Sequence, residues 1–243
     1  ALGRVRNRVL NRAVRHLVFG PVQLHLNEVR RSLGLAPIVD RAMLDAAGLY
    51  YRRYLQATIP AFEYPRSDLP MNVEFIGPLL PSAPTSFSRP VWWDRLDRSR
   101  PVVLVTQGTV AKDPAQLILP TLAALRNEPV TVIVTAPGWE GPRDLPGNAI
   151  IAGFVPYSEL LPRVSVMVTN GGYGGVQFAL SHGVPLVVAG LTEAKAEINA
   201  RVAWAKVGIN LKAQVPRSAA IRSAVREVLH GETYRAQAHR LRD

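Results

Sequence analysis

Four glycines within six residues are the feature of this sequence with the clearest chemical use. The segment 170–175 reads Asn-Gly-Gly-Tyr-Gly-Gly and follows an apolar run at 164–169 that is typical of a buried strand. Glycines at the start of a helix let backbone N–H groups approach an anion, and the helix dipole favours negative charge there. We therefore predict a phosphate site at this turn. The alternative is a tight turn whose glycines only permit positive φ angles.

Other phosphate and metal motifs do not fit. Gly172 and Gly174 match the first two glycines of the dinucleotide fingerprint, but the third position is Gln177. The sequence contains no Walker motif, no His-Glu-x-x-His, no Gly-x-Ser-x-Gly and no Asp-x-Asp. It also contains no cysteine, which excludes disulfides and thiolate metal sites. We predict neither a metal site nor a cofactor.

The elements that would position the glycine turn alternate between strand and helix. Strands are expected at 102–106, 130–135, 149–152, 164–169, 186–189 and 209–211. Helices are expected at 114–126, 158–161, after the turn as far as Gly183, 193–206 and 217–229. This alternation predicts an α/β fold with a doubly wound parallel sheet, whose ligands bind beyond the carboxyl ends of the strands. The turn Gln107-Gly108-Thr109 also follows a strand, so we expect both glycine turns to share one crevice.

The first third of the chain is basic and less regular. Helices are expected at 4–19 and 21–34, strands at 49–59 and 73–76, and a linker rich in Pro and Ser from 77. Residues 1–53 hold ten arginines against three acidic residues, which gives +7 of the chain's net +11. This patch could meet nucleic acid or make weak contact with an anionic membrane surface. Because no aromatic residues alternate with these arginines, we favour a solvated helix face and predict no nucleic-acid partner.

No apolar run approaches the length of a membrane span, and the first residues show no signal-peptide pattern. The expectation is a soluble, cytoplasmic protein.

Several motifs in a fixed order resemble family 1 glycosyltransferases. They are Phe-Ile-Gly-Pro-Leu (75–79), Val-Thr-Gln-Gly-Thr (105–109), Gly-Phe-Val-Pro (153–156), Val-Thr-Asn-Gly-Gly-Tyr-Gly-Gly (168–175) and His-Gly-Val-Pro-Leu-Val-Val (182–188). The resemblance extends from about residue 54 to the end of the chain. Family members of the macrolide and natural-product kind have the GT-B fold, use UDP- or dTDP-sugars and need no metal.

The resemblance implies a division into three parts. Residues 1–76 would be the tail of an incomplete N-terminal domain that binds the acceptor, 77–98 the interdomain linker, and 99–243 the nucleotide-sugar-binding domain. The implied partners are a UDP- or dTDP-sugar, a small-molecule acceptor and the missing N-terminal half of the same protein. The family's catalytic His lies in that half, and none of the five histidines here matches it. We therefore name no catalytic residue and expect this chain alone to be inactive. A non-catalytic partner of another transferase is the alternative.

The resemblance also implies a set of donor-binding residues. Phe154 would stack on the base, although a core position at a strand end is equally open, and the backbone of Val155 would bond the base edge. Asn170 stands where the family usually has a phosphate-binding His. The family's ribose-binding Glu falls on Phe178, so Gln177 is the candidate substitute. Glu193 or Lys195 would face the sugar, although a role as charges at a helix start or on the surface is equally open. The full set is Gly108, Thr109, Phe154, Val155, Asn170, Gly171, Gly172, Gly174, Gly175, Gln177, Glu193 and Lys195.

Overall fold

A computed structural model describes residues 2–39, 52–67, 69–96, 99–108 and 113–243. The chain divides into two compact units, which are described separately. The first consists of Ala1–Gln56 and Arg66–Ile76, and the second of Ala57–Pro65 and Gly77–Asp243. Within the described residues, no helix combines the length and the apolar character that crossing a membrane requires.

Within its described residues, the first unit holds two helices and one pair of short strands. The helices are α1 (Leu2–Leu17) and α2 (Gly20–Ser32), close to the predicted bounds. Strand β1 (Tyr54–Gln56) pairs in parallel with β2 (Val73–Phe75). The predicted strand 49–59 is therefore too long at its end, because the chain joins the second unit at Ala57 and is no longer paired with β2. Its first residues, 49–51, lie outside the described residues.

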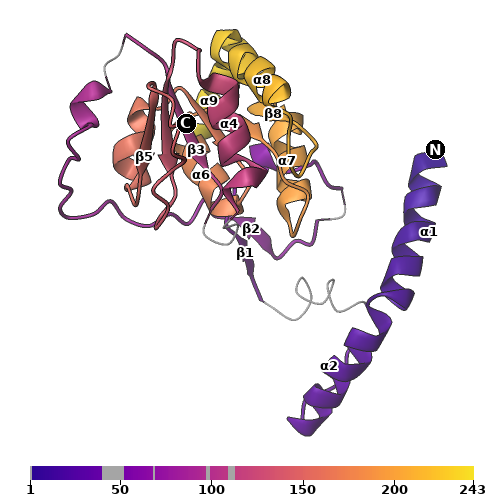
Figure 1. Ribbon diagram of the computed structural model, residues 1–243. Coiled ribbons are helices and arrows are strands. Elements are labelled where there is room, and N and C mark those ends of the chain that lie inside the picture. The colour runs from indigo at the N-terminus through magenta and orange to yellow at the C-terminus, as the bar shows by residue number, and fades with distance from the viewer. Residues whose placement is uncertain (1, 40–51, 68, 97–98, 109–112) are drawn as a thin grey trace. The chain divides into compact units, whose positions relative to one another are not determined.

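Within the described part of the second unit, six strands form one sheet in which all neighbours are parallel (Figure 1). The strands are β3 (Val102–Thr106), β4 (Thr131–Thr135), β5 (Ala149–Ala152), β6 (Val166–Thr169), β7 (Leu186–Val188) and β8 (Gly208–Asn210). Their order across the sheet is β5-β4-β3-β6-β7-β8, so the topology reverses between β3 and β6. The predicted doubly wound parallel sheet is confirmed.

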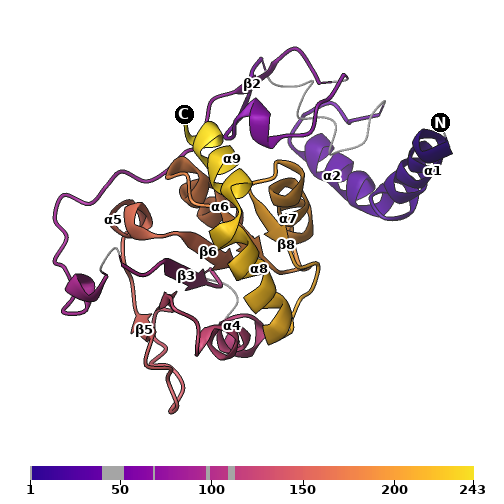
Figure 2. The same cartoon turned by 90° about the horizontal axis from the view of Figure 1, so that it is seen from above.

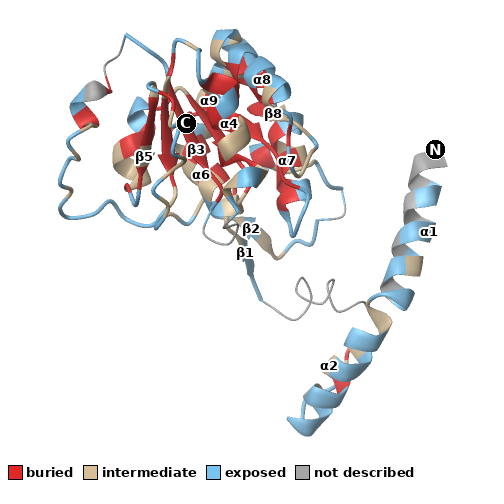
Figure 3. Ribbon diagram, viewed as in Figure 1, coloured by how far each residue is buried: buried red, intermediate tan, exposed pale blue. Residues whose placement is uncertain are grey.

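The core lies on both faces of this sheet, as the buried strands in Figure 3 show. Alternate residues of each strand point to opposite faces, so Val103 and Val105 belong to one apolar cluster and Leu104 to the other. Helices α4 (Ile118–Leu125) and α8 (Ser218–His230) cover the first face. The opposite face is covered by α5 (Tyr157–Leu160), α6 (Tyr173–Ser181), α7 (Lys195–Trp204) and α9 (Glu232–Arg242), and Figure 2 shows the helices around the sheet.

Several helix bounds differ from the prediction, and each difference has a local cause. The helix expected at 114–126 is broken into a 3-10 turn, η4 (Pro114–Gln116), and α4, because a distant side chain caps α4. The short helix expected at 158–161 is α5 followed by a second 3-10 turn that contains a proline. Helix α9 was not predicted from the sequence. Its only fully buried residue is Ala238, so it lacks an apolar stripe that the pattern could reveal.

The segment 57–65 packs against the helices of the second unit. Phe62 is buried, and Glu63 forms an ion pair with Arg201 of α7 at 2.8 Å. Burial opposes the charge of Arg201, but its hydrogen bond with Glu63 contributes to a net rise of its pKa. The predicted linker, 77–98, also contributes to the core of this unit, because Trp93 within it is only 3% exposed.

Candidate functional site

The two central strands end in the same way. Both run through Val-Thr into an amide residue and a glycine, and their last residues, Thr106 and Thr169, are paired in register. Each threonine hydroxyl accepts the N–H of the glycine two residues later, Gly108 at 3.3 Å and Gly171 at 3.4 Å. Both glycines have positive φ, 72° and 87°. The two glycine turns therefore lie side by side where the sheet topology reverses, as the sequence predicted.

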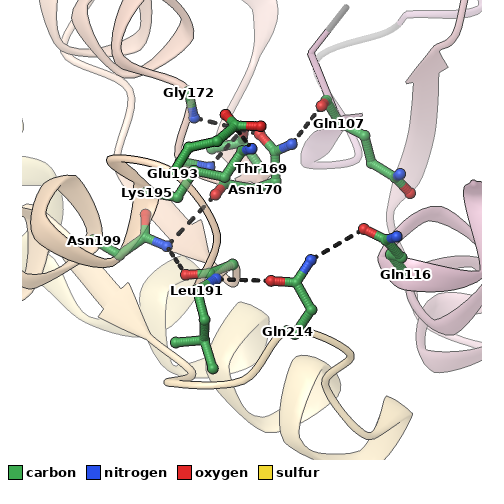
Figure 4. A network of polar contacts seen from close by, with 12 residues as sticks. Gln107, Gln116, Thr169, Asn170, Gly172, Leu191, Glu193, Lys195, Asn199 and Gln214 are labelled. Carbon is green, nitrogen blue, oxygen red and sulfur yellow. Dashed lines mark hydrogen bonds and ion pairs between the residues drawn. The ribbon is translucent and has the colours of Figure 1, made fainter. Parts of the chain in front are cut away.

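Asn170 ties the two turns together. Its side-chain Nδ2 donates to the carbonyl oxygen of Gln107, and its Oδ1 accepts the N–H of Gly172 at 3.3 Å (Figure 4). The side chain of Gln107 continues the connection, because its Oε1 accepts the N–H groups of Leu117 and Ile118 at the start of α4. This pair of bonds caps α4 and explains why the helix begins later than predicted. The second hydrogen of the Asn170 Nδ2 has no acceptor within the described residues.

The glycine turn is shorter than predicted, because α6 already begins at Tyr173. Of its four glycines, Gly171 alone has positive φ. A Cβ added at Gly171 would lie 1.8 Å from Oδ1 of Asn199, so the fold itself requires glycine there. At Gly174 the same test finds no atom within 4 Å.

The other two glycines also have room for a side chain. A Cβ would meet its nearest atom at 3.8 Å at Gly172 and at 3.5 Å at Gly175, which is ordinary van der Waals contact. The N–H groups of Tyr173, Gly174 and Gly175 have no backbone or side-chain acceptor within the described part of the chain. Within the described residues, neither backbone strain nor packing requires the glycines at 172, 174 and 175, and the N–H donors beside them have no acceptor.

A buried ammonium group lies close to this turn. Lys195, the first residue of α7, is 8% exposed, and its Nζ is 2.7 Å from Oε2 of Glu193. Glu193 has the uncommon φ of 57° for a residue with a side chain. A Cβ placed on Gly190 would lie 3.2 Å from Cδ of Lys195 and 2.5 Å from the carbonyl oxygen of Asn170. The loop after β7 therefore approaches the glycine turn closely and brings Lys195 with it.

Two further connections were missed by the sequence reasoning. Asn199 of α7 donates to the carbonyl oxygens of Gly190 at 3.0 Å and of Asn170 at 3.5 Å. Gln214 accepts the N–H of Leu191 and donates to Oε1 of Gln116, as Figure 4 shows. Amide side chains on helices and loops are common, so no spacing in the sequence distinguished these two.

Four of the predicted residues remain, namely Phe154, Val155, Gln177 and Thr109. Phe154, which follows β5, is 83% exposed and so is not a core residue, whereas Val155 is buried. Gln177 is buried on α6 and donates to the carbonyl oxygen of Ala57 at 3.0 Å, so this amide nitrogen is used within the protein. Thr109 lies outside the described residues. No cluster of three or more His, Asp or Glu that could hold a metal ion occurs in the described ranges.

Known proteins resemble the chain in sequence and in structure. The model of the erythromycin biosynthesis protein CIII-like, C-terminal domain, matches residues 116–243. The 4'-demethylrebeccamycin synthase of Lentzea aerocolonigenes is 46% identical over 100% of this chain and 57% of its own length. UDP-glycosyltransferase 2 of Phaeomoniella chlamydospora is 38% identical over 99% of this chain and 54% of its own length. The chain thus spans little more than half of these relatives.

Solved structures extend the similarity to the fold. The kitacinnamycin glycotransferase superposes with a TM-score of 0.74 and 21% identity, over 99% of this chain and 62% of its own. The calicheamicin glycosyltransferase CalG4 gives a TM-score of 0.71 and 21% identity, over 91% of this chain and 54% of its own. These values establish a shared fold, so the α/β architecture is that of GT-B glycosyltransferases.

Proposed function

Because the chain belongs to the family of erythromycin biosynthesis protein CIII-like C-terminal domains, we propose that it forms the donor-binding part of a nucleotide-sugar-dependent glycosyltransferase. The whole protein would move a sugar from a UDP- or dTDP-sugar to a hydroxyl of a small-molecule acceptor. The names of two relatives, a rebeccamycin synthase and a UDP-glycosyltransferase, agree with this class of reaction. Because the chain spans about half of each relative, the proposal assigns it only the donor side.

One observation carries the proposal, namely the three glycines whose missing side chains the fold does not require. Glycine is a poorer helix former than every residue except proline, yet Gly174 and Gly175 are the second and third residues of α6. The presence of glycine here is explained if a phosphate binds to the N–H groups of Tyr173, Gly174 and Gly175, because side chains at 174 and 175 would block its approach. These donors would hold the diphosphate of the donor and stabilise it as the leaving group.

The other site residues complete the donor site. The exposed ring of Phe154 is free to stack on the base, a contact worth about 1–3 kcal/mol in comparable sites. The backbone of Val155 would bond the base edge. Lys195 and Glu193 would face the sugar or the diphosphate, and the ammonium of Lys195 would supply the positive charge that a metal supplies elsewhere. We propose that donor binding needs no divalent ion.

The catalytic base would lie in the part of the protein that this chain lacks. A base takes the proton of the acceptor hydroxyl, the oxygen attacks the anomeric carbon, and the bond to the diphosphate breaks as the nucleoside diphosphate leaves. His182 follows the last residue of α6, at the end opposite the glycine turn, and its Nδ1 lies 3.0 Å from the carbonyl oxygen of Phe178. His230 and His239 belong to α8 and α9, and neither helix begins at the site.

Calorimetry with UDP and dTDP tests the donor assignment. We expect the chain to bind at least one of them with or without a chelator, and no binding of either would refute the proposal. Product formation by the full-length protein from a UDP- or dTDP-sugar and phenolic or macrolide acceptors tests the reaction. Nucleotide binding without transfer by the full-length protein would favour the non-catalytic partner instead.

A further inference from the structure

Asn199 occupies an unusual position beneath the glycine turn. Its side chain is fully buried on α7, and its Nδ2 lies between two carbonyl oxygens that belong to different loops. One is Gly190 O in the loop after β7, at 3.0 Å, and the other is Asn170 O in the glycine turn, at 3.5 Å. A single amide thus connects the loop between β7 and α7, which leads to Lys195, with the turn that precedes α6, as Figure 4 shows.

The same side chain fits closely against Gly171. A Cβ on Gly171 would lie 1.8 Å from Oδ1 of Asn199 and 2.7 Å from its Cγ. The amide therefore occupies the space that a side chain at Gly171 would need, and it does so where φ is 87°. Asn199 thus contacts the turn on two sides, through a carbonyl oxygen and through the Cα of the next residue.

Asn199 is poorly satisfied as a core residue. Its Oδ1 is buried and has no hydrogen-bond partner in the described part of the chain. An unpartnered buried acceptor costs free energy, so an apolar residue of similar volume would suit packing alone. The geometry of the two Nδ2 contacts is the feature that an apolar residue could not supply.

We propose that Asn199 is a positioning residue that holds the glycine turn in the conformation that binds the donor's diphosphate. This inference rests on the proposed function, because it assigns the phosphate to the N–H groups of Tyr173, Gly174 and Gly175. Without the bonds from Asn199, the peptide between Asn170 and Gly171 is held only by the N–H of Gly171 on the hydroxyl of Thr169 at 3.4 Å, so its orientation is less restricted. Those N–H groups then no longer converge on one point, and binding of the phosphate weakens while binding of the base does not.

Asn148 provides a matched control for the substitution. It is also an asparagine whose Nδ2 donates to backbone carbonyls, those of Leu125, Glu128 and Val130, and whose buried Oδ1 has no partner in the described residues. It directly precedes β5, at the amino end of the sheet, opposite the end that carries the glycine turns. Asn148→Ala therefore removes the same chemistry from a place where no phosphate would bind.

The test compares a nucleoside with its diphosphate in the 243-residue chain. The dissociation constants of UDP and uridine, or of dTDP and thymidine if that pair binds better, are measured for the unmodified chain, Asn199→Ala and Asn148→Ala. We expect Asn199→Ala to weaken the diphosphate at least about tenfold, or about 1.4 kcal/mol. The nucleoside should change less than about threefold, or about 0.7 kcal/mol, and Asn148→Ala should alter neither ligand by more than that.

Amide hydrogen exchange gives a second readout that needs no ligand. Exchange of the Gly171 and Gly172 amides, which are hydrogen-bonded in the unmodified chain, should accelerate in Asn199→Ala but not in Asn148→Ala. If Asn199→Ala does not fold, Asn199→Ser, which keeps one donor, should show the same selectivity with a smaller loss. Equal losses for nucleoside and diphosphate, or unchanged diphosphate affinity, would overturn the positioning role alone. If the unmodified chain binds neither diphosphate, the proposed function is refuted, and so is this inference.

Discussion

Substitution of Gly174 by valine separates the two explanations of the glycine turn. Gly174 is exposed in the first turn of α6, and apart from the backbone of that helix no atom of the described residues lies within 4 Å of a Cβ built on it. Valine is also a better helix former than glycine. The folded chain should therefore accept Gly174→Val without loss of stability. If the turn binds a phosphate, however, the branched side chain fills the space that the phosphate needs.

The size of the expected loss follows from the donors at this turn. A hydrogen bond to a charged group contributes about 1.5–3 kcal/mol. Displacing the phosphate from one of the three open N–H groups should therefore weaken UDP or dTDP by about 10- to 150-fold, and displacement from two should abolish measurable binding. Gly174→Ala, with a smaller side chain, should lose less than Gly174→Val.

Calorimetry of nucleotide binding and thermal unfolding should be measured on the same protein samples. Gly147 is the matched control, because it is also exposed and has no atom within 4 Å of an added Cβ, but it lies before β5 at the other end of the sheet. Gly147→Val should keep both affinity and stability. Unchanged nucleotide affinity in a folded Gly174→Val protein would falsify the phosphate interpretation of the turn.

Four further predictions concern the base, the metal, the fold and the reaction. Phe154→Ala should weaken nucleotide binding by about 5- to 150-fold, the value of one stacked base, without altering the melting temperature, because the ring is 83% exposed; an unchanged affinity would place the base elsewhere. Adding a chelator should leave nucleotide affinity within about threefold, and a loss of tenfold or more, about 1.4 kcal/mol, would contradict metal independence. Hydrogen bonding from Arg226 lowers the pKa of Glu128, so this carboxylate stabilises the fold above its unfolded-state pKa and that contribution disappears as pH falls through its folded-state pKa. Glu128→Gln should therefore lower the urea midpoint near neutral pH and converge with the unmodified chain in acid, and a difference that persists in acid would contradict this origin. The chain alone should show no sugar transfer, because loss of a general base typically costs about 10²–10⁴ in rate and loss of the acceptor pocket removes positioning as well; robust transfer by the chain alone would mean that a base lies among its 243 residues.

The parts of the fold that the sequence predicted are those with strong local patterns. Val102–Thr106 and Val166–Thr169 are buried on both faces, so they appear as continuous apolar runs that need no tertiary information. The bounds that were wrong depend on distant contacts. The break before α4 is caused by Gln107, whose Oε1 caps a helix that starts eleven residues later. No pattern within the window of a single helix contains that contact.

The site shows the same division between local and distant information. The alternation of strands and helices indicated a parallel sheet with both glycine turns at its carboxyl ends, whereas the pairing of β3 with β6, which sets the turns side by side, comes from the structure. The partners of Asn170 and Gln177 do not follow from spacing, because both amides donate to backbone carbonyls of segments far away in the sequence, Gln107 and Ala57. The family resemblance implied that these two residues bind a ligand. In the structure, both side chains donate hydrogen bonds to the protein's own backbone.

Asn170 shows what this difference means for the mechanism. Its position in the resemblance suggests a phosphate ligand, but one amide hydrogen already joins the two glycine turns, and its oxygen accepts the N–H of Gly172 within its own turn. Substituting Asn170 would therefore move the backbone N–H groups as well as remove one donor, and the two effects could not be told apart. Asn199 would not contact the proposed phosphate. In the same turn, it donates a hydrogen bond only to the carbonyl oxygen of Asn170. Its substitution changes the geometry of the donors while leaving every donor in place, so it isolates the contribution of positioning to diphosphate binding.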